Sequence, residues 1–91
     1  MAVMVYIPTP YRQFTGNVAQ VEAQGGNVLS LVQELEGRFP GLRQRLLGPD
    51  GRLYRHLNIY VNDELVDDRQ GIRTPLHDGD QVAVIPPISG G

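Results

Sequence analysis

The first apolar residues of the chain alternate in a way that predicts β-structure. Valine or isoleucine occupies every second position of residues 3–7, and the residues between are largely apolar, so we expect a strand with both faces partly covered. Pro8 and Pro10 end it. Residues 11–16 then predict a loop, and residues 18–23 alternate more plainly. They predict a hairpin partner of the first strand, nearer an edge of the sheet.

The next apolar residues recur at spacings of three and four, which is typical of an α-helix with one buried face. The stripe consists of Val28, Leu31, Val32, Leu35 and Phe39. Asn27 is a suitable N-cap, and Pro40-Gly41 should stop the helix. Glu34 and Arg38 stand four residues apart, so they can pair on its outer side. Gly25-Gly26 should close the strand before it.

The second half of the chain predicts more strands. Residues 42–47 favour a short turn of helix, and residues 48–51 have the composition of a loop. Residues 57–61 alternate and predict a strand, followed by a turn at residues 62–63 and a short return at residues 64–66. Residues 82–85 are apolar at every position, so this last strand should be covered on both faces and lie inside the sheet.

One amphipathic helix against one mixed sheet of four to five strands makes a two-layer α+β domain. Ninety-one residues with 41% apolar content fit one small domain. We place that domain at residues 1–85 and treat residues 86–91 as a flexible tail. Leu57, Ile59 and Val61 should face the helix. For Tyr60 we favour core packing, with a docking surface as the alternative.

The tail is the candidate functional site. Pro86 and Pro87 remove two backbone donors, so the last strand cannot continue and the chain must leave the sheet. Gly90 has no Cβ and can pass through a narrow channel, which Ile88 and Ser89 would also occupy. The carboxylate of Gly91 is ionised at neutral pH, so it can attack the α-phosphate of a nucleoside triphosphate and form an acyl-adenylate.

The composition of the chain excludes several kinds of side-chain chemistry. The chain has no cysteine, which excludes disulfides and thiolate metal sites on its side chains. All eight basic residues are arginine, so no lysine can accept an activated acyl group. Residues 1–55 carry a net charge of about +2 and residues 56–91 about −4 by simple counting, and we expect the acidic half to steer the tail toward a cationic cleft. Residues 1–7 lack the features of a signal peptide or membrane anchor, so we expect a cytoplasmic protein.

These features together resemble the MoaD/ThiS family of ubiquitin-like (β-grasp) sulfur carriers. The resemblance rests on the order of elements, on Asp78-Gly79-Asp80, on the strand and prolines of residues 82–87, and on Ser89-Gly90-Gly91. Residues 7–9, Thr15-Gly16 and residues 58–64 look most like the CysO-type branch, which serves cysteine synthesis. The loop at residues 43–55 is longer than in molybdopterin-type members.

The resemblance implies a carrier that is not itself an enzyme. An adenylating enzyme with a ubiquitin-activating-type fold would use ATP to activate Gly91, and a sulfur donor would then leave a thiocarboxylate there. A pyridoxal-phosphate cysteine synthase would take the sulfur, and a metalloprotease would free the cysteine. The alternatives are the small subunit of molybdopterin synthase, acting with its large subunit, and a ubiquitin-like modifier or plain interaction domain. The chain itself would bind no cofactor, no nucleic acid and no membrane.

Other residue groups have weaker functional interpretations. Ser30 with His56 or His77 and an aspartate could be named a triad, but the chain lacks a nucleophile elbow. The two histidines have no short metal-ligand spacing, and no glycine-rich phosphate loop lies between a strand and a helix. A possible RNA-binding patch, which we expect to be only a solvated loop, consists of Arg43, Arg45, Arg52, Arg55 and Tyr54.

Overall fold

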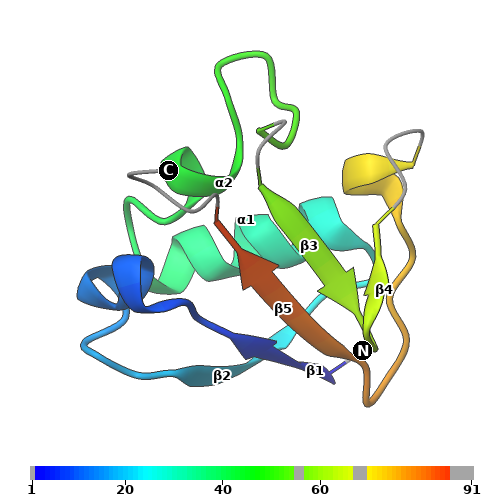
Figure 1. Ribbon diagram of the computed structural model, residues 1–91, viewed down its shortest axis with the longest axis horizontal. Helices are drawn as coiled ribbons and strands as arrows, with labels where there is room; N and C mark the ends of the chain where they lie inside the picture. Colours follow the sequence, from blue (N-terminus) through cyan, green and yellow to red (C-terminus); the bar gives the residue numbers. More distant parts are fainter. Residues whose placement is uncertain (1, 55–56, 67–69, 87–91) are drawn as a thin grey trace.

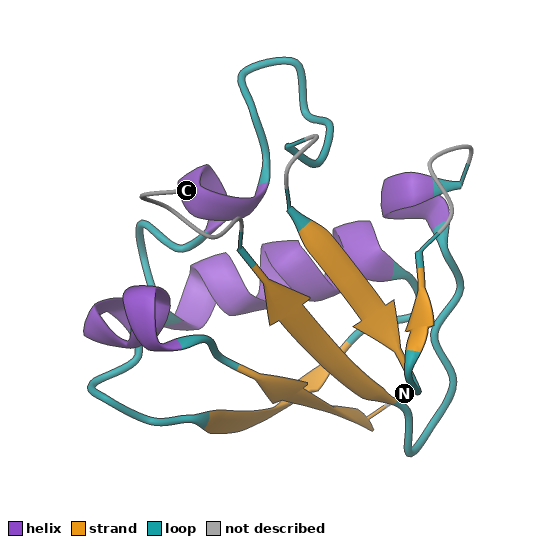
Figure 2. Cartoon of the chain, in the orientation of Figure 1, coloured by secondary structure: helices purple, strands orange, loops and turns teal. Residues whose placement is uncertain are grey.

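The predicted strands form one mixed sheet with α1 packed against one face, as Figures 1 and 2 show. The computed structural model describes residues 2–54, 57–66 and 70–86. The elements are β1 (Ala2–Tyr6), η1 (Thr9–Phe14), β2 (Gln20–Gln24), α1 (Val28–Arg38), α2 (Arg43–Leu46), β3 (Asn58–Val61), β4 (Glu64–Leu65), η2 (Gly71–Arg73) and β5 (Gln81–Ile85). The predicted α+β class is confirmed.

The strands lie in the order β2-β1-β5-β3-β4. β5 is the central strand, parallel to β1 and antiparallel to β3, while β1–β2 and β3–β4 are antiparallel pairs. The predictions that the last strand lies inside the sheet and that the second strand lies at an edge are therefore confirmed. β2 begins at Gln20 and not at Val18, because the amide of Val18 donates to the carbonyl of Thr15 within a turn.

The helix α1 begins where its cap predicts. The Oδ1 atom of Asn27 accepts from the amide of Ser30 at 2.8 Å, and the Oγ atom of Ser30 accepts from the amide of Asn27 at 3.1 Å, which completes a capping box. The helix ends at Arg38, with Phe39 as its C-cap. Arg38 lies 3.7 Å from Glu34, so the predicted surface ion pair is confirmed.

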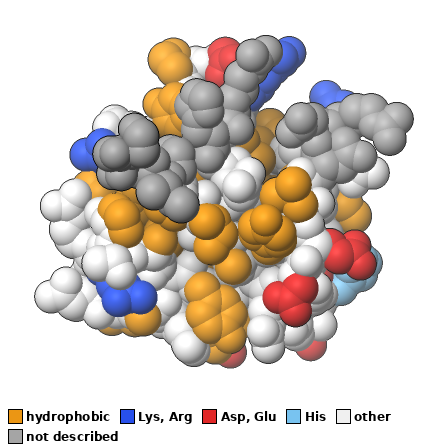
Figure 3. Space-filling view, in the orientation of Figure 1, with side chains coloured by type: hydrophobic (Ala, Val, Ile, Leu, Met, Phe, Trp, Pro, Cys, Tyr) orange, Lys and Arg blue, Asp and Glu red, His pale blue; other side chains and the backbone are white. Residues whose placement is uncertain are grey.

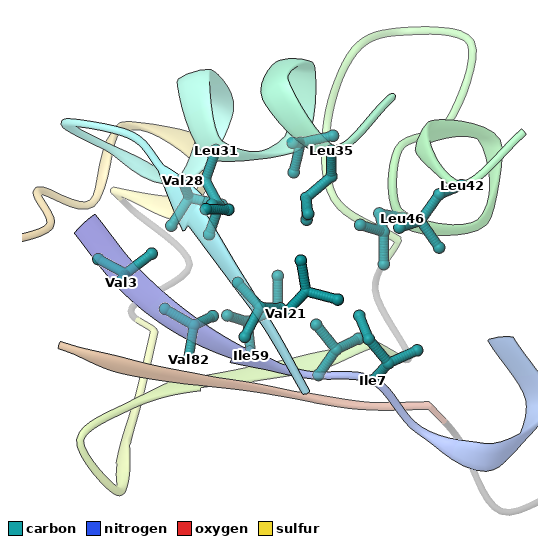
Figure 4. Packing of buried hydrophobic residues seen from close by; sticks show 14 of the residues in the cluster. Val3, Ile7, Val21, Val28, Leu31, Leu35, Leu42, Leu46, Ile59 and Val82 are labelled. Atoms are coloured by element: carbon teal, nitrogen blue, oxygen red, sulfur yellow. The ribbon is translucent and has the colours of Figure 1, made fainter. Parts of the chain in front are cut away.

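The core lies between α1 and one face of the sheet (Figure 4). The helix contributes Val28, Leu31, Val32 and Leu35, and the facing strand residues include Val3, Val5, Val21, Ile59 and Val82. Leu42 and Leu46 extend the core beneath α2. Of residues 57, 59 and 61, which we expected to face the helix, the first two are buried and the third packs against the core from a partly exposed position.

The prediction that β5 is covered on both faces is wrong. Val82 and Val84 are buried, but Ala83 is half-buried and Ile85 is 46% exposed. The reason is that the described helices and loops cover only the face that carries Val82 and Val84. A run of apolar residues indicates a central strand, but it does not show that both faces are packed.

Residues 9–14 form a 3-10 helix, η1, so the predicted loop at residues 11–16 is wrong in its first part. Pro10 lies in the first turn of this helix, where its fixed φ and missing amide cost little. The amides of Thr15 and Asn17 both donate to the carbonyl of Arg12 and end it. Among residues 2–54, 57–66 and 70–86, none of the helices has the length and apolar character needed to cross a bilayer.

Candidate functional site

The structure describes the start of the predicted tail. Ile85 is the last residue of β5, and Pro86, which is half-buried, follows it directly. We call these two residues the tail root. Pro87, Ile88, Ser89, Gly90 and Gly91 lie outside the described residues, so the roles assigned to them, and the division of the chain at residue 85, stay predictions.

The tail root is anchored by the centre of the sheet. The pairing of β5 with β1 ends at Ala83, opposite Tyr6, whereas the pairing with β3 continues to Ile85, opposite Asn58. Val82 and Val84 are only 1% and 6% exposed, so two buried side chains hold the strand within four residues of Pro86. The exit direction of the chain is thus set by a central strand.

The two short helices η1 and α2 lie beside the tail root. Because β1 and β5 are parallel, η1 follows β1 at the end of the sheet where β5 finishes, which we call the exit end. The hydroxyl of Tyr11 donates to the carbonyl of Arg45 at 3.4 Å, and the guanidinium of Arg45 lies 5.2 Å from the ring centre of Phe14. Burial raises the pKa of Tyr11, so its hydroxyl keeps the proton that it donates.

Four arginines lie on the helices and loops at the exit end: Arg12 on η1, Arg43 and Arg45 on α2, and Arg52 in the loop that follows α2. Arg12 donates through Nε to the carbonyl of Ile7 at 3.0 Å and is half-buried, while the side chains of Arg43, Arg45 and Arg52 are exposed. Two carboxylates lie among them. Glu36 accepts from the amides of Arg43 and Gly41, which lower its pKa, and Asp50 accepts from the amide of Arg52.

The exit-end arginines include most of the predicted basic patch. Arg43 and Arg45 lie on α2, and Arg52 lies in the loop that follows it, whereas Arg55 lies outside the described residues. Sequence reasoning missed Arg12, because we read its segment as a loop. The two prolines at residues 8 and 10 were the available signal, since proline is frequent in the first turn of a helix.

The acidic residues that we expected beside the tail lie at the opposite end of the sheet. Asp63 and Glu64 belong to the β3–β4 turn and its return strand, and Asp78 and Asp80 lie in the turn that enters β5. We call this the turn end. β5 separates the two ends by about 16 Å, at about 3.3 Å for each of its five residues. For these four carboxylates, the expectation that acidic residues beside the tail steer it toward a cationic cleft is wrong.

A hydrogen-bond network fixes the turn end. Asp80 accepts from the amide of His77 at 2.7 Å and from Nδ2 of Asn62 at 2.8 Å, and both bonds lower its pKa, the bond from His77 more strongly. The Oδ1 atom of Asn62 in turn accepts from the amide of Gln81 at 3.0 Å. The carboxylate of Asp80 therefore has a structural role.

The uncovered face of the sheet carries a row of side chains that crosses all five strands. The register of the strands aligns Gln20, Tyr6, Ala83, Tyr60 and Leu65, which we call the outer row. Leu65 is 55% exposed, and hydrophobic side chains spread over the centre of this face in Figure 3. Tyr60 belongs to this face, and it is absent from the residues packed on the core, so its favoured role in the core is wrong.

The residues of the weaker interpretations have other roles. The Oγ atom of Ser30 accepts from the amides of Gly26 and Asn27 at the start of α1, so its environment is that of a cap. His77 is exposed, with Nδ1 3.8 Å from Asp80, and His56 lies outside the described residues. Among the residues that the structure describes, no group of three or more histidines and carboxylates could hold a metal ion.

Comparison with known proteins defines the class of the chain. The model of the ThiS family matches residues 5–91, so the chain belongs to the ThiS family. The resemblance seen in the sequence and the expected β-grasp fold are both confirmed.

Individual relatives are similar over most or all of the chain. The sulfur carrier protein CysO of Mycobacterium tuberculosis is 41% identical over 93 residues, which cover 100% of both chains. A chain of the crystal structure of the Amycolatopsis orientalis BexX/CysO complex matches with a TM-score of 0.91 and 39% identity, over 98% of this chain and 99% of that one. Small archaeal modifier protein 3 of Haloferax volcanii is 40% identical over 70 residues, 77% of this chain and 72% of its own length.

Proposed function

We propose that this chain is a sulfur carrier whose terminal glycine, Gly91, is converted to a thiocarboxylate. The observation that carries the proposal is the full-length similarity to proteins named as sulfur carriers, in a chain whose last described residue, Pro86, directly follows the central strand. The finer proposal is that the sulfur serves cysteine synthesis, because the relatives that match over the whole chain are CysO proteins.

The chemistry at Gly91 would occur in two steps. A carboxylate oxygen attacks the α-phosphate of ATP, and pyrophosphate leaves. Sulfide then attacks the acyl carbon, and AMP leaves with its bonding electrons, which gives the thiocarboxylate. A free carboxylate is a poor electrophile, so the adenylate makes the second step possible, while cationic groups of the partner stabilise the developing charge.

The partner would supply the ATP site and the catalytic groups. We propose an adenylating enzyme as the first partner, a pyridoxal-phosphate cysteine synthase as the sulfur acceptor and a metalloprotease that releases the product. The chain itself would contribute position alone: a rigid strand, a fixed exit at Pro86 and two glycines that fit a narrow channel. In this proposal it binds no cofactor and acts in the cytoplasm.

The outer face of the sheet would lie against the adenylating enzyme. Ile85 is part of both the tail root and this face, so a protein that takes the tail is brought next to the outer row. Tyr60 offers an amphipathic side chain and Leu65 an apolar one for contact with the enzyme, and neither residue packs in the core.

The direct test is an intact-mass measurement. The chain is incubated with the adenylating enzyme, ATP and sulfide, and we expect the mass gain of one oxygen replaced by sulfur. Deletion of Gly91, or Gly90→Val, should abolish this gain while the thermal unfolding midpoint stays unchanged. Retained thiocarboxylate in both variants would contradict the proposal. The measured mass before incubation establishes that Gly91 is the terminal residue of the protein used.

A further inference from the structure

The exit end and the turn end carry opposite charge. Arg12, Arg43, Arg45 and Arg52 lie at the exit end with two carboxylates, whereas Asp63, Glu64, Asp78 and Asp80 lie at the turn end with His77. In Figure 3 the larger red groups lie at the lower right of the hydrophobic centre, and other red atoms lie at the top and bottom edges of the view. The net charge of −2 for the whole chain conceals this separation.

The exit-end guanidinium groups form no ion pair within the described residues, although two backbone amides, and in addition the charge of Arg43, lower the pKa of Glu36. Within the described part of the chain, ion pairs of at most 4 Å join Arg38 to Glu34 and His77 to Asp80, and neither involves the exit-end arginines. The oxygens of Glu36 accept from backbone amides, as does Oδ1 of Asp50, so these carboxylates serve the turns. A charged side chain that stays exposed and unpaired contributes little to folding and is free for a partner.

The two ends act on a partner independently. Their separation of about 16 Å is twice the screening length of about 8 Å at physiological salt. A partner at the exit end therefore experiences the arginines and little of the turn-end carboxylates.

We propose that Arg43 and Arg52, with Arg45 and Arg12 behind them, form a docking surface for an acidic rim around the tail channel of the adenylating enzyme. This inference rests on the proposed function, because the tail and the arginines leave the same end of the sheet. Opposite charges at the rim of an interface raise the association rate and fix the orientation of docking.

RNA is another anionic partner, and the structure favours it less. The described arginine cluster is small, and Arg45 is already stacked on Phe14, which leaves Tyr54 as the exposed aromatic side chain beside it. The chain as a whole is acidic, which opposes binding to a polyanion.

The test compares the same substitution, arginine to glutamate, at the exit end and at a position away from it. Arg43→Glu and Arg52→Glu are made singly and together, and Arg73→Glu, on η2, which lies away from η1 and α2 in Figure 1, changes the net charge of the chain by the same amount. kcat/KM for thiocarboxylate formation is measured against salt concentration. We expect about a three- to tenfold fall at low salt for each exit-end variant, more for the double variant, and a flatter salt dependence. Arg73→Glu should stay within about twofold of the wild type.

Three further measurements keep the outcomes distinct. Binding of a chain that lacks Gly91 to the adenylating enzyme is followed by calorimetry, so docking is tested without the chemistry. If this chain binds and loses affinity with Arg43→Glu while wild type acquires no sulfur, the proposed function fails and the docking surface stands. The docking surface would be overturned if Arg43→Glu and Arg73→Glu had equal effects, or if the chain did not bind the adenylating enzyme. It would also be overturned if Arg43→Glu lowered the affinity for a single-stranded RNA oligonucleotide and not for the enzyme. Arg43→Lys with Arg52→Lys should keep the wild-type rate if charge is the cause.

Discussion

Asn62 donates through Nδ2 to Oδ1 of Asp80 at 2.8 Å, and its own Oδ1 accepts from the amide of Gln81 at 3.0 Å. One side chain of the β3–β4 turn thus joins that turn to the first residue of the central strand. Asn62 has φ of 52°, a conformation that asparagine tolerates better than most residues. The position therefore favours asparagine for two reasons, its hydrogen bonds and its backbone angle.

Asp80→Asn should make stability less dependent on pH. The pKa of Asp80 is lowered in the folded protein, so its ionised form stabilises the fold. This contribution is complete well above pH 3.8, the ordinary value, and is lost as the pH falls from there through the lower folded-state pKa. Urea unfolding should show Asp80→Asn less stable than wild type at pH 7, with a difference that shrinks toward acid pH.

The control for this change is Asp63→Asn, in the same turn. Among the described residues, no hydrogen bond to the Asp63 carboxylate is present, so this variant should unfold within about 0.5 kcal/mol of wild type at pH 7. A constant difference between Asp80→Asn and wild type over the acid range would contradict the assigned role.

Gly25→Ala should destabilise the fold by about 1–3 kcal/mol. A Cβ at Gly25 would lie 2.9 Å from the Cα and N atoms of Leu31, and backbone atoms of a packed helix cannot move aside easily. The neighbouring Gly26 has open space around its Cβ position and serves as the control, with Gly26→Ala expected close to wild type. Thermal unfolding of the two variants measures the difference; equal midpoints would refute the close approach.

Ile85→Ser should weaken charging without weakening the fold. Ile85 and Val18 are equally exposed, at 46%, but Ile85 lies on the outer face at the tail root and Val18 lies in the turn before β2. We expect kcat/KM to fall about fivefold or more for Ile85→Ser, because anchors near a docking site carry more than about 1 kcal/mol. Val18→Ser should keep the wild-type value. If both variants are charged at the wild-type rate, the outer face does not contact the adenylating enzyme.

Ser30→Ala should reduce stability by about 1 kcal/mol and leave charging unchanged. Its hydroxyl accepts two backbone amides at the start of α1, and alanine cannot replace them. Gln33→Ala, on the exposed side of the same helix, is the matched control and should unfold within about 0.5 kcal/mol of wild type. Loss of thiocarboxylate formation in Ser30→Ala would show that this hydroxyl has a chemical role that the capping box does not account for.

Local chemistry explains which elements could be predicted from the sequence. The start of α1 follows from one asparagine, its end from Pro40-Gly41, and the central position of β5 from four consecutive apolar residues. Each depends on the backbone preferences of a few neighbouring residues. The 3-10 helix at residues 9–14 was missed because two prolines so close together also fit a loop.

The location of charge could not be predicted in this way. Residues 56–91 are acidic as a group, and the tail belongs to them, so proximity in sequence indicated proximity in space. Residues on either side of a strand lie far apart in space, however. Asp80 comes directly before β5 and Pro86 comes directly after it. The exposed state of Ile85 likewise depends on how many layers cover the sheet, which no local pattern contains.

The parallel pairing of β1 with β5 has a practical consequence for experiments. The amide of Ala2 donates to Asp78 at 3.1 Å, so the chain enters the sheet at the turn end and leaves β5 at the exit end (Figure 1). A purification handle or fluorescent label fused ahead of Ala2 would extend away from the enzymes that handle the tail. Immobilising the protein through such a fusion should present the reactive end to solution, which suits surface-based assays of loading and release.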